Sequence, residues 1–201
     1  MNNIQTIILL ALNEIKNYGP KTIIELYSNF RYLNDNLFDF PDFIEFLKSK
    51  NLNEEFIEIF NQKVVYIQNE LSKDKVKSIK IISFFDDEYP IQLTLLKNPP
   101  LFLFCRGNTI LLKNMNNIAI VGTRGNSELG AKIAAKTAYS FVDYKYTIVS
   151  GLARGIDTAA HIGTLRNNGN TIAILTDLNK IYPSENMSLA NEILHKNGLL
   201  L

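Results

Sequence analysis

This 201-residue sequence has only one cysteine, no long apolar run and no marked excess of one charge. The single cysteine, Cys105, can form neither an intramolecular disulfide nor a zinc cage, so nothing indicates an oxidising compartment. The apolar run at residues 7–12 is too short to cross a bilayer and lacks the basic flank of a signal peptide. A net charge of +1 with 46% hydrophobic residues argues against disorder. We therefore expect a globular, cytoplasmic protein that does not bind membranes.

The first part of the chain has the pattern of a small all-helical domain. Residues 1–75 carry a net charge of −3, whereas residues 76–201 carry +4. Apolar residues recur there at helical spacing. The expected helices span residues 4–16, 41–49 and 53–71, with a further helix that begins at Pro20. The turn at residues 17–22 fits either a helix-hairpin-helix that grips DNA or, as the acidic charge of this domain favours, a scaffold or protein contact.

From residue 76 onward, short strands alternate with helices. The expected strands are 79–85, 101–105, 117–121, 146–150 and 171–175, and the expected helices are 127–142, 156–165 and about 187–196. Apolar strands alternating with helices predict βαβ units and an α/β fold with a parallel sheet buried on both faces. The chain ends as a further strand opens at Leu199, so we expect an incomplete sheet with uncovered strand edges.

Two glycine-containing loops each follow a strand and precede a helix. The first contains Gly122, Thr123, Arg124 and Gly125, and the second contains Ser150, Gly151, Arg154 and Gly155. The carboxyl ends of neighbouring parallel strands meet at one edge of a sheet, so both loops are expected to line one crevice. Glycines allow close approach of a ligand, and helix N-termini and arginines attract phosphate. The alternative is that the glycines only permit close helix packing while the arginines are exposed.

The sequence does not favour a dinucleotide site or any other cofactor. The glycines at 122, 125 and 130 depart from the G-x-G-x-x-G spacing. In addition, the strand at 146–150 does not end in the acidic residue that would bind a ribose.

Asp157 and His161 lie four residues apart and therefore share one helix face. His161 is expected either to face a phosphate or catalytic centre, oriented by Asp157, or, as is more common, to make a structural hydrogen bond. In both cases the negative charge of Asp157 is favourable at the N-terminus of the helix, where the helix dipole is positive. No further histidine or cysteine stands at metal-ligand spacing, because His195 falls on another predicted helix. We therefore expect no metal site.

Taken together, the motifs resemble the DNA-processing protein A family (DprA, also called Smf). They are IAIVGTR at 118–124, IVSGLARGIDTAAH at 148–161, TIAIL at 171–175 and IYPSEN at 181–186. Upstream, Tyr89, Pro90 and the YGPKT segment at 18–22 also resemble that family. The resemblance covers nearly the whole chain, and S-G-L-A-R-G-I-D-x-x-A-H is its most specific element.

This resemblance implies a protein that binds incoming single-stranded DNA during natural transformation, protects it and helps to load the RecA recombinase. It implies no bond-making chemistry, and a homodimer in the full-length family. By position, Gly122, Thr123 and Arg124 match the family's phosphate-contacting G-S-R element, and Ser150, Gly151, Arg154 and Gly155 match its second loop. It also implies that residues 1–75 form a SAM or helix-hairpin-helix-like domain and that residues 76–201 form the first part of an extended Rossmann-like domain.

The sequence also departs from the family in two places. Asp177 stands where the family has a glycine, and a carboxylate facing a phosphate crevice opposes anion binding unless it turns outward. The chain also stops at Leu201, before the family's basic F-P-x-R-N-R segment and the surfaces used for dimerisation and RecA contact. A C-terminally truncated member is therefore expected. The alternatives are a phosphoribohydrolase-like enzyme that cleaves nucleoside monophosphates and an inactive fragment.

Three further side chains have ordinary packing explanations. Tyr182 and Phe104 have rings that suit stacking on nucleobases, but buried aromatic packing is the commoner role. Cys105 is expected in the core.

Overall fold

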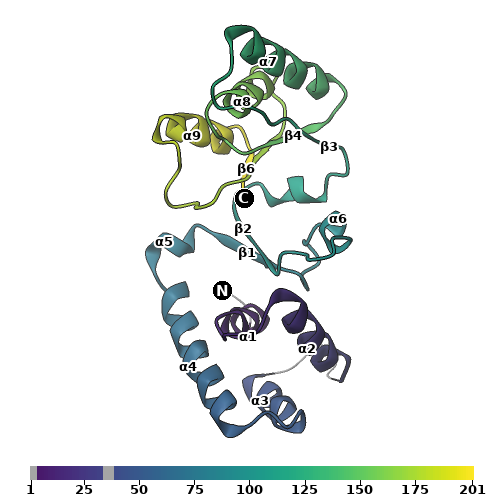
Figure 1. Cartoon of the computed structure of the whole chain (residues 1–201), viewed down its shortest axis with the longest axis vertical. Helices are drawn as coiled ribbons and strands as arrows, with labels where there is room; N and C mark the ends of the chain where they lie inside the picture. Colours follow the sequence, from purple (N-terminus) through teal and green to yellow (C-terminus); the bar gives the residue numbers. More distant parts are fainter. Residues whose placement is uncertain (1–3, 34–38) are drawn as a thin grey trace. The chain divides into compact units, whose positions relative to one another are not determined.

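The computed structural model describes residues 4–33 and 39–201 and divides into two compact units between Leu103 and Phe104 (Figure 1). The sequence pattern changes earlier, near residue 76. The difference arises because Ile81, Phe84, Phe85 and neighbouring apolar residues pack on the helical core of the first unit. Within the described ranges, no helix is long and apolar enough to span a membrane.

The first unit is a helical core with one short strand. Its elements are α1 (Ile4–Asn13), α2 (Pro20–Leu33), α3 (Phe40–Ser49), α4 (Glu54–Leu71), α5 (Asp74–Lys77), β1 (Lys80–Ser83) and α6 (Ile91–Thr94). Helix α1 packs against α2 and α4, as its apolar spacing predicts. Three aromatic residues, Tyr27, Phe30 and Phe43, are fully buried and contact one another.

The second unit contains a mixed sheet with helices between its strands. Its elements are β2 (Phe102–Gly107, which begins in the first unit), η1 (Thr109–Lys113), β3 (Asn117–Ala119), α7 (Glu128–Asp143), β4 (Thr147–Ser150), α8 (Ile156–Arg166), β5 (Thr171–Ala173), η2 (Ser184–Asn186), α9 (Met187–His195) and β6 (Leu199–Leu200). The strands of this unit lie in the order β2-β6-β5-β4-β3. Strands β3 to β6 are parallel, as predicted, whereas β2 pairs antiparallel with β6.

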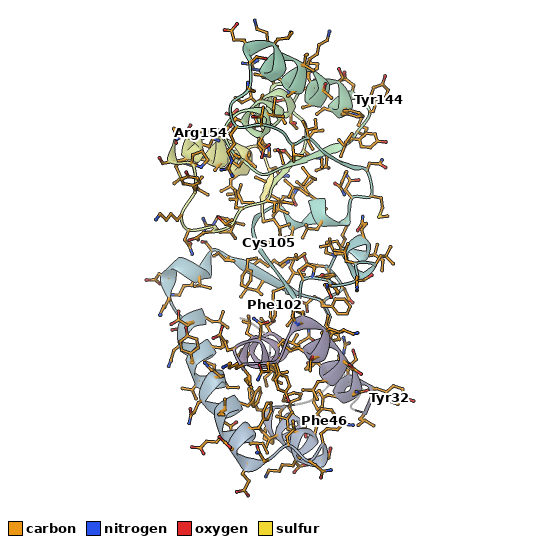
Figure 2. All side chains as sticks on the ribbon, in the orientation of Figure 1. Tyr32, Phe46, Phe102, Cys105, Tyr144 and Arg154 are labelled. Carbon is orange, nitrogen blue, oxygen red and sulfur yellow. The ribbon has the colours of Figure 1, made fainter. Side chains whose placement is uncertain are left out.

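Strand β6 is enclosed by its neighbours. It lies between β5 and β2, with Leu199 and Leu200 paired to residues on both sides. Both leucines are buried. The expectation of an uncovered edge at Leu199 is therefore wrong, because β2, far away in the sequence, covers that edge. Cys105 of β2 is buried, as predicted (Figure 2).

The helices of the second unit cover one face of its sheet. Helix α7 packs along α8, as Figure 1 shows, and α8 also contacts α9. Strands β3, β4, β5 and β6 follow one another in a single direction across the sheet, so right-handed connections place all three helices on the same face. Beyond the strand ends, Val121 and Ile174 are 69% and 52% exposed. Within the central strands β4 and β5, successive residues on both faces are buried or half-buried, as predicted, whereas the edge strand β3 is more exposed.

Candidate functional site

The first glycine loop leaves β3 and enters α7 under tight steric limits. A Cβ on Gly122 would lie 2.7 Å from Ile156 Cγ1, so only glycine fits there without displacement. The hydroxyl of Thr123 accepts a hydrogen bond from the backbone N–H of Gly125 at 3.2 Å. Ser127 caps α7 by accepting from the Gly130 N–H at 3.1 Å, which completes the strand-to-helix turn.

The second glycine loop leaves β4 and enters α8. Leu152 and Gly155 have positive φ angles of 54° and 84°. The buried Ser150 donates its hydroxyl to the Ile120 carbonyl at 2.6 Å, so this hydroxyl joins the two strand ends. The hydroxyl of Ser150, a residue that the sequence places in the candidate site, is thus already used in a hydrogen bond within the protein.

The structure places the two loops side by side. The Ile156 N–H donates to the carbonyl of Thr123 at 3.3 Å. Gly155 lies so close to that carbonyl that a Cβ would overlap it. This adjacency follows from the pairing of β3 with β4, which brings both strand ends to one edge.

Asp157 joins the two loops through its buried carboxylate. Its Oδ1 accepts from the Gly122 N–H at 3.4 Å, and its Oδ2 accepts from the Gly151 N–H at 3.1 Å. Asp157 is only 7% exposed. The N–H groups of these two glycines therefore serve an internal anion, and the outer part of the crevice is left for a ligand.

A cavity of about 380 Å³ opens between the two loops and the segment that follows β5. It is lined by Arg124, Gly125, Gly151, Ala153, Arg154, Ile174, Leu175, Thr176, Asp177, Tyr182 and Pro183. Its volume lies at the lower end of the range of small-molecule sites, which is roughly 300–1,000 Å³. It therefore has room for a small group, such as part of one nucleotide.

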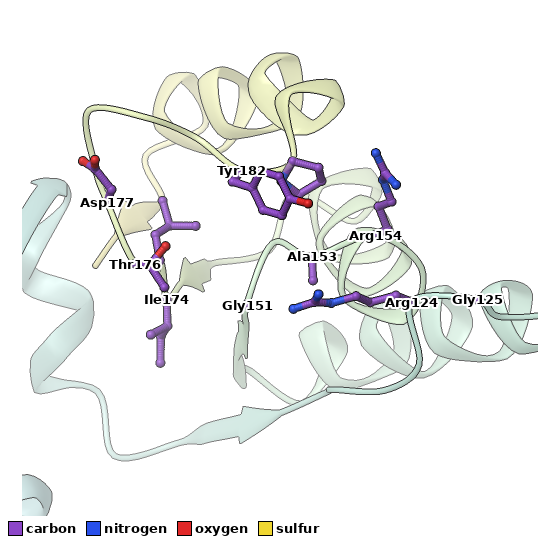
Figure 3. A pocket seen from close by; sticks show the side chains of 11 residues that line it. Arg124, Gly125, Gly151, Ala153, Arg154, Ile174, Thr176, Asp177 and Tyr182 are labelled. Atoms are coloured by element: carbon purple, nitrogen blue, oxygen red, sulfur yellow. The ribbon is translucent and has the colours of Figure 1, made fainter.

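The two arginines of the loops differ in their surroundings. Figure 3 shows the Arg124 side chain reaching toward the middle of the cavity, beneath Tyr182, whereas Arg154 points away from it. In the described part of the chain, Arg124 has neither an ion pair nor a hydrogen bond from its side chain. Arg154 forms an ion pair with Glu185, and both side chains are more than half exposed. The expectation that both guanidinium groups are free for phosphate thus holds only for Arg124.

Two carboxylates lie beside the crevice. Glu185 belongs to η2, and a hydrogen bond from its own backbone, together with Arg154, lowers the pKa of its carboxyl. Asp177 lines the opposite wall, where its Oδ1 accepts from the Asn179 N–H at 2.7 Å. In Figure 3 its carboxylate points away from Arg124. Asp177 therefore turns outward and does not neutralise Arg124.

His161 is a buried structural residue. The Thr171 hydroxyl donates to the Ile148 carbonyl at 2.8 Å, so it accepts from His161 Nδ1–H at 2.7 Å. Burial lowers the pKa of His161 to about 4. The histidine is neutral at pH 7 and does not contact a ligand in the crevice, which fits its structural interpretation.

Sequence reasoning missed three features of this site. Tyr182 is 71% exposed beside the cavity, so the expectation of buried packing is wrong for it, and Phe104 is also exposed at 45%. Glu185 and the buried Asn186 lie in the IYPSEN segment, which was recognised as a motif without a role for either residue. The available signal was a carboxylate, Glu185, two residues after Pro183 in the same short segment. Among residues 4–33 and 39–201, no group of three His, Cys, Asp or Glu side chains is placed to hold a metal ion.

Fold and crevice together define a Rossmann-like α/β protein with two glycine loops and an unpaired arginine at the carboxyl edge of its sheet. The model of the family described as DNA recombination-mediator protein A matches residues 80–201. The chain therefore belongs to the DNA recombination-mediator protein A family, which includes the DprA and Smf proteins.

Individual relatives agree with this assignment. DNA processing protein DprA of Streptococcus pneumoniae is 38% identical over 136 residues, which are 67% of this chain and 48% of that protein. Protein Smf of Synechocystis is 31% identical over 211 residues, covering 100% of this chain and 51% of Smf. The chain thus spans about half the length of these relatives.

Two solved structures resemble the chain as well. The X-ray structure of the Streptococcus pneumoniae protein gives a TM-score of 0.70 at 26% identity, covering 98% of this chain and 65% of that one. A Helicobacter pylori DNA processing protein A, studied for its single-stranded DNA binding mode, gives a TM-score of 0.53 at 29% identity. That match covers 64% of this chain and 56% of the other.

Proposed function

We propose that this chain binds single-stranded DNA without sequence preference, as part of DNA uptake in natural transformation. In this role it protects incoming DNA in the cytoplasm and helps to load RecA, and it performs no bond-making step. The family membership and the single-stranded DNA binding of the Helicobacter pylori relative support this proposal. Residues 1–75 act as a helical accessory domain, residues 76–201 carry the DNA site, and RecA and a second copy are its protein partners.

The unpaired guanidinium of Arg124 is the observation that carries the proposal. It extends into a cavity beside two helix N-termini, where a phosphate is favoured by the helix dipoles and by bidentate hydrogen bonds. The DNA site in this proposal is formed by the two loops, with residues Gly122, Thr123, Arg124, Ser150, Gly151, Arg154 and Gly155, and with Asp157 and His161 in support. Asp157 and Ser150 act by holding the loops together, whereas Arg124 contacts the DNA.

The exposed apolar residues of the crevice favour a single strand over a duplex. Tyr182 and Ile174 expose most of their side chains at the cavity wall. Unpaired bases stack on such surfaces, with about 1–3 kcal/mol per base on an aromatic side chain. Bases within a duplex are stacked on each other and do not offer their faces.

A binding titration with a fluorescent oligothymidylate tests the proposal. Arg124→Ala removes a charged hydrogen-bond donor worth about 1.5–3 kcal/mol, so the affinity should fall about 10- to 100-fold. Arg166→Ala is the matched control, because this exposed arginine stands in the last turn of α8, at the end opposite the crevice. It should change the affinity less than about twofold. Equal binding by the wild-type chain and by Arg124→Ala would refute the site.

An oligonucleotide of the same length with abasic sites separates base contacts from phosphate contacts. Its backbone charge is unchanged, so only stacking is lost. We expect at least a fivefold weaker complex, on the order of 1 kcal/mol. Equal affinity for both oligonucleotides would remove the role of Tyr182 and Ile174.

A further inference from the structure

The ion pair between Arg154 and Glu185 is held by the fold on both sides. Glu185 lies in η2, and the next residue, Asn186, is buried. The Asn186 side-chain amide donates to the Leu152 carbonyl at 2.8 Å. It also donates to the Thr158 hydroxyl at 2.8 Å. The segment that carries Glu185 is therefore fastened to the second glycine loop.

The loop on the arginine side is fixed as well. The Ala153 carbonyl, one residue before Arg154, accepts from the backbone N–H of Thr158 at 3.1 Å and from its hydroxyl at 2.7 Å. Thr158 thus contacts both the Arg154 loop and Asn186. Thr158 therefore fixes the backbone next to both partners of the ion pair, which holds the two long side chains within reach of each other.

The pair makes the two arginines of the crevice unequal. Arg124 is directed into the cavity, but Arg154 is directed toward Glu185, away from the cavity (Figure 3). Both arginines belong to the lining of the same cavity, so a strand with one phosphate at Arg124 continues past Arg154 at the rim. A phosphate that approaches Arg154 meets a guanidinium already neutralised by a carboxylate.

We propose that the phosphate contact of Arg154 is a second subsite of this crevice, which Glu185 keeps closed until a strand displaces its carboxylate. This inference rests on the proposed DNA-binding function and deepens it. On binding, the phosphate replaces the Glu185 carboxylate on Arg154, so one charged hydrogen bond is exchanged for another. The exchange yields little net affinity in the wild-type chain, and Glu185 thereby limits how tightly the crevice holds a strand.

Removing the carboxylate should therefore open the subsite. In Glu185→Gln, the guanidinium of Arg154 is free, and a repelling negative charge beside the strand is gone. We expect about three- to tenfold tighter binding of oligothymidylate. The dependence of log affinity on log salt should steepen by about 0.7, the value for one additional phosphate neutralised on a single strand.

The inference is tested by a double-mutant cycle with Arg154→Ala, Glu185→Gln and the double variant. Arg154→Ala should change the affinity less than about threefold in the wild-type background, but should remove the whole gain in the Glu185→Gln background. Glu192→Gln, an exposed carboxylate on α9, controls for the loss of one negative charge and should leave the affinity within about twofold of wild type.

The outcomes distinguish this inference from the function on which it rests. In the first outcome, the wild-type chain binds DNA through Arg124, but Glu185→Gln gains no affinity or gains no more than Glu192→Gln. This outcome overturns the closed subsite and leaves the DNA-binding function intact. Absence of binding by both the wild-type chain and Glu185→Gln overturns the function and the subsite together. A gain in Glu185→Gln that survives the removal of Arg154 also overturns the subsite.

Discussion

Replacing Asp157 by alanine should separate the two glycine loops and destabilise the second unit. The carboxylate is buried and accepts a hydrogen bond from Gly151 at 3.1 Å and a longer one from Gly122 at 3.4 Å. A hydrogen bond to a charged group contributes about 1.5–3 kcal/mol, and the longer one contributes less. The carboxylate at the start of α8 adds roughly 0.3–1 kcal/mol. We therefore expect a loss of about 2–4 kcal/mol in the free energy of unfolding.

Urea unfolding followed by circular dichroism measures this loss. Asp157→Asn keeps one acceptor oxygen but loses the charge, so it should fall between the wild type and Asp157→Ala. Glu128→Gln is the matched control, because this exposed carboxylate also lies in the first turn of a helix and pairs with Lys132 of the same helix. It should lose no more than about 0.5 kcal/mol. If Asp157→Ala unfolds like Glu128→Gln, the carboxylate does not hold the loops and our reasoning is refuted.

Two other substitutions follow from the packing of the second unit. The pKa of His161 is about 4 when folded and 6.5 when unfolded, so the unfolded chain binds more protons between these values. The free energy of unfolding is therefore highest above pH 6.5 and falls by up to about 3 kcal/mol as the pH drops toward 4. A His161→Gln variant should lack this decrease, and a variant with the same pH profile as the wild type would contradict the prediction. Gly155→Ala forces a side chain onto a φ of 84° and against the Thr123 carbonyl, and should lose more than about 1 kcal/mol in a thermal melt. Gly125→Ala meets no atom within 4 Å and should lose much less; equal losses would exclude the steric explanation.

The sequence predicted the parallel direction of strands β3 to β6 and, for neighbouring strands, the adjacency of the two loops, because both follow from local patterns. Alternating apolar strands and helices require parallel pairing, and parallel pairing brings the strand ends to one edge. The antiparallel contact of β2 with β6 was not predictable in this way. It joins segments distant in sequence, and no short-range periodicity encodes which strand lies beside Leu199.

Within the site, the sequence identified which residues lie near the crevice but not which are free. Arg124 and Arg154 have similar positions relative to their strands, yet only Arg154 has a carboxylate partner. That difference depends on Asn186, whose buried amide places Glu185 beside the second loop. Such tertiary hydrogen bonds determine charge pairing, and they leave no periodic signal in the chain. The exposure of Tyr182 could not be predicted for a related reason, because it depends on how the loops at the carboxyl edge of the sheet pack together.

The salt dependence of binding by the wild-type chain and by Arg124→Ala tests the central claim most directly. If Arg124 neutralises one phosphate of a single strand, the slope of log affinity against log salt should be shallower by about 0.7 in the variant. Arg166→Ala should keep the wild-type slope. Identical slopes for the wild type and Arg124→Ala would contradict a phosphate site at this arginine.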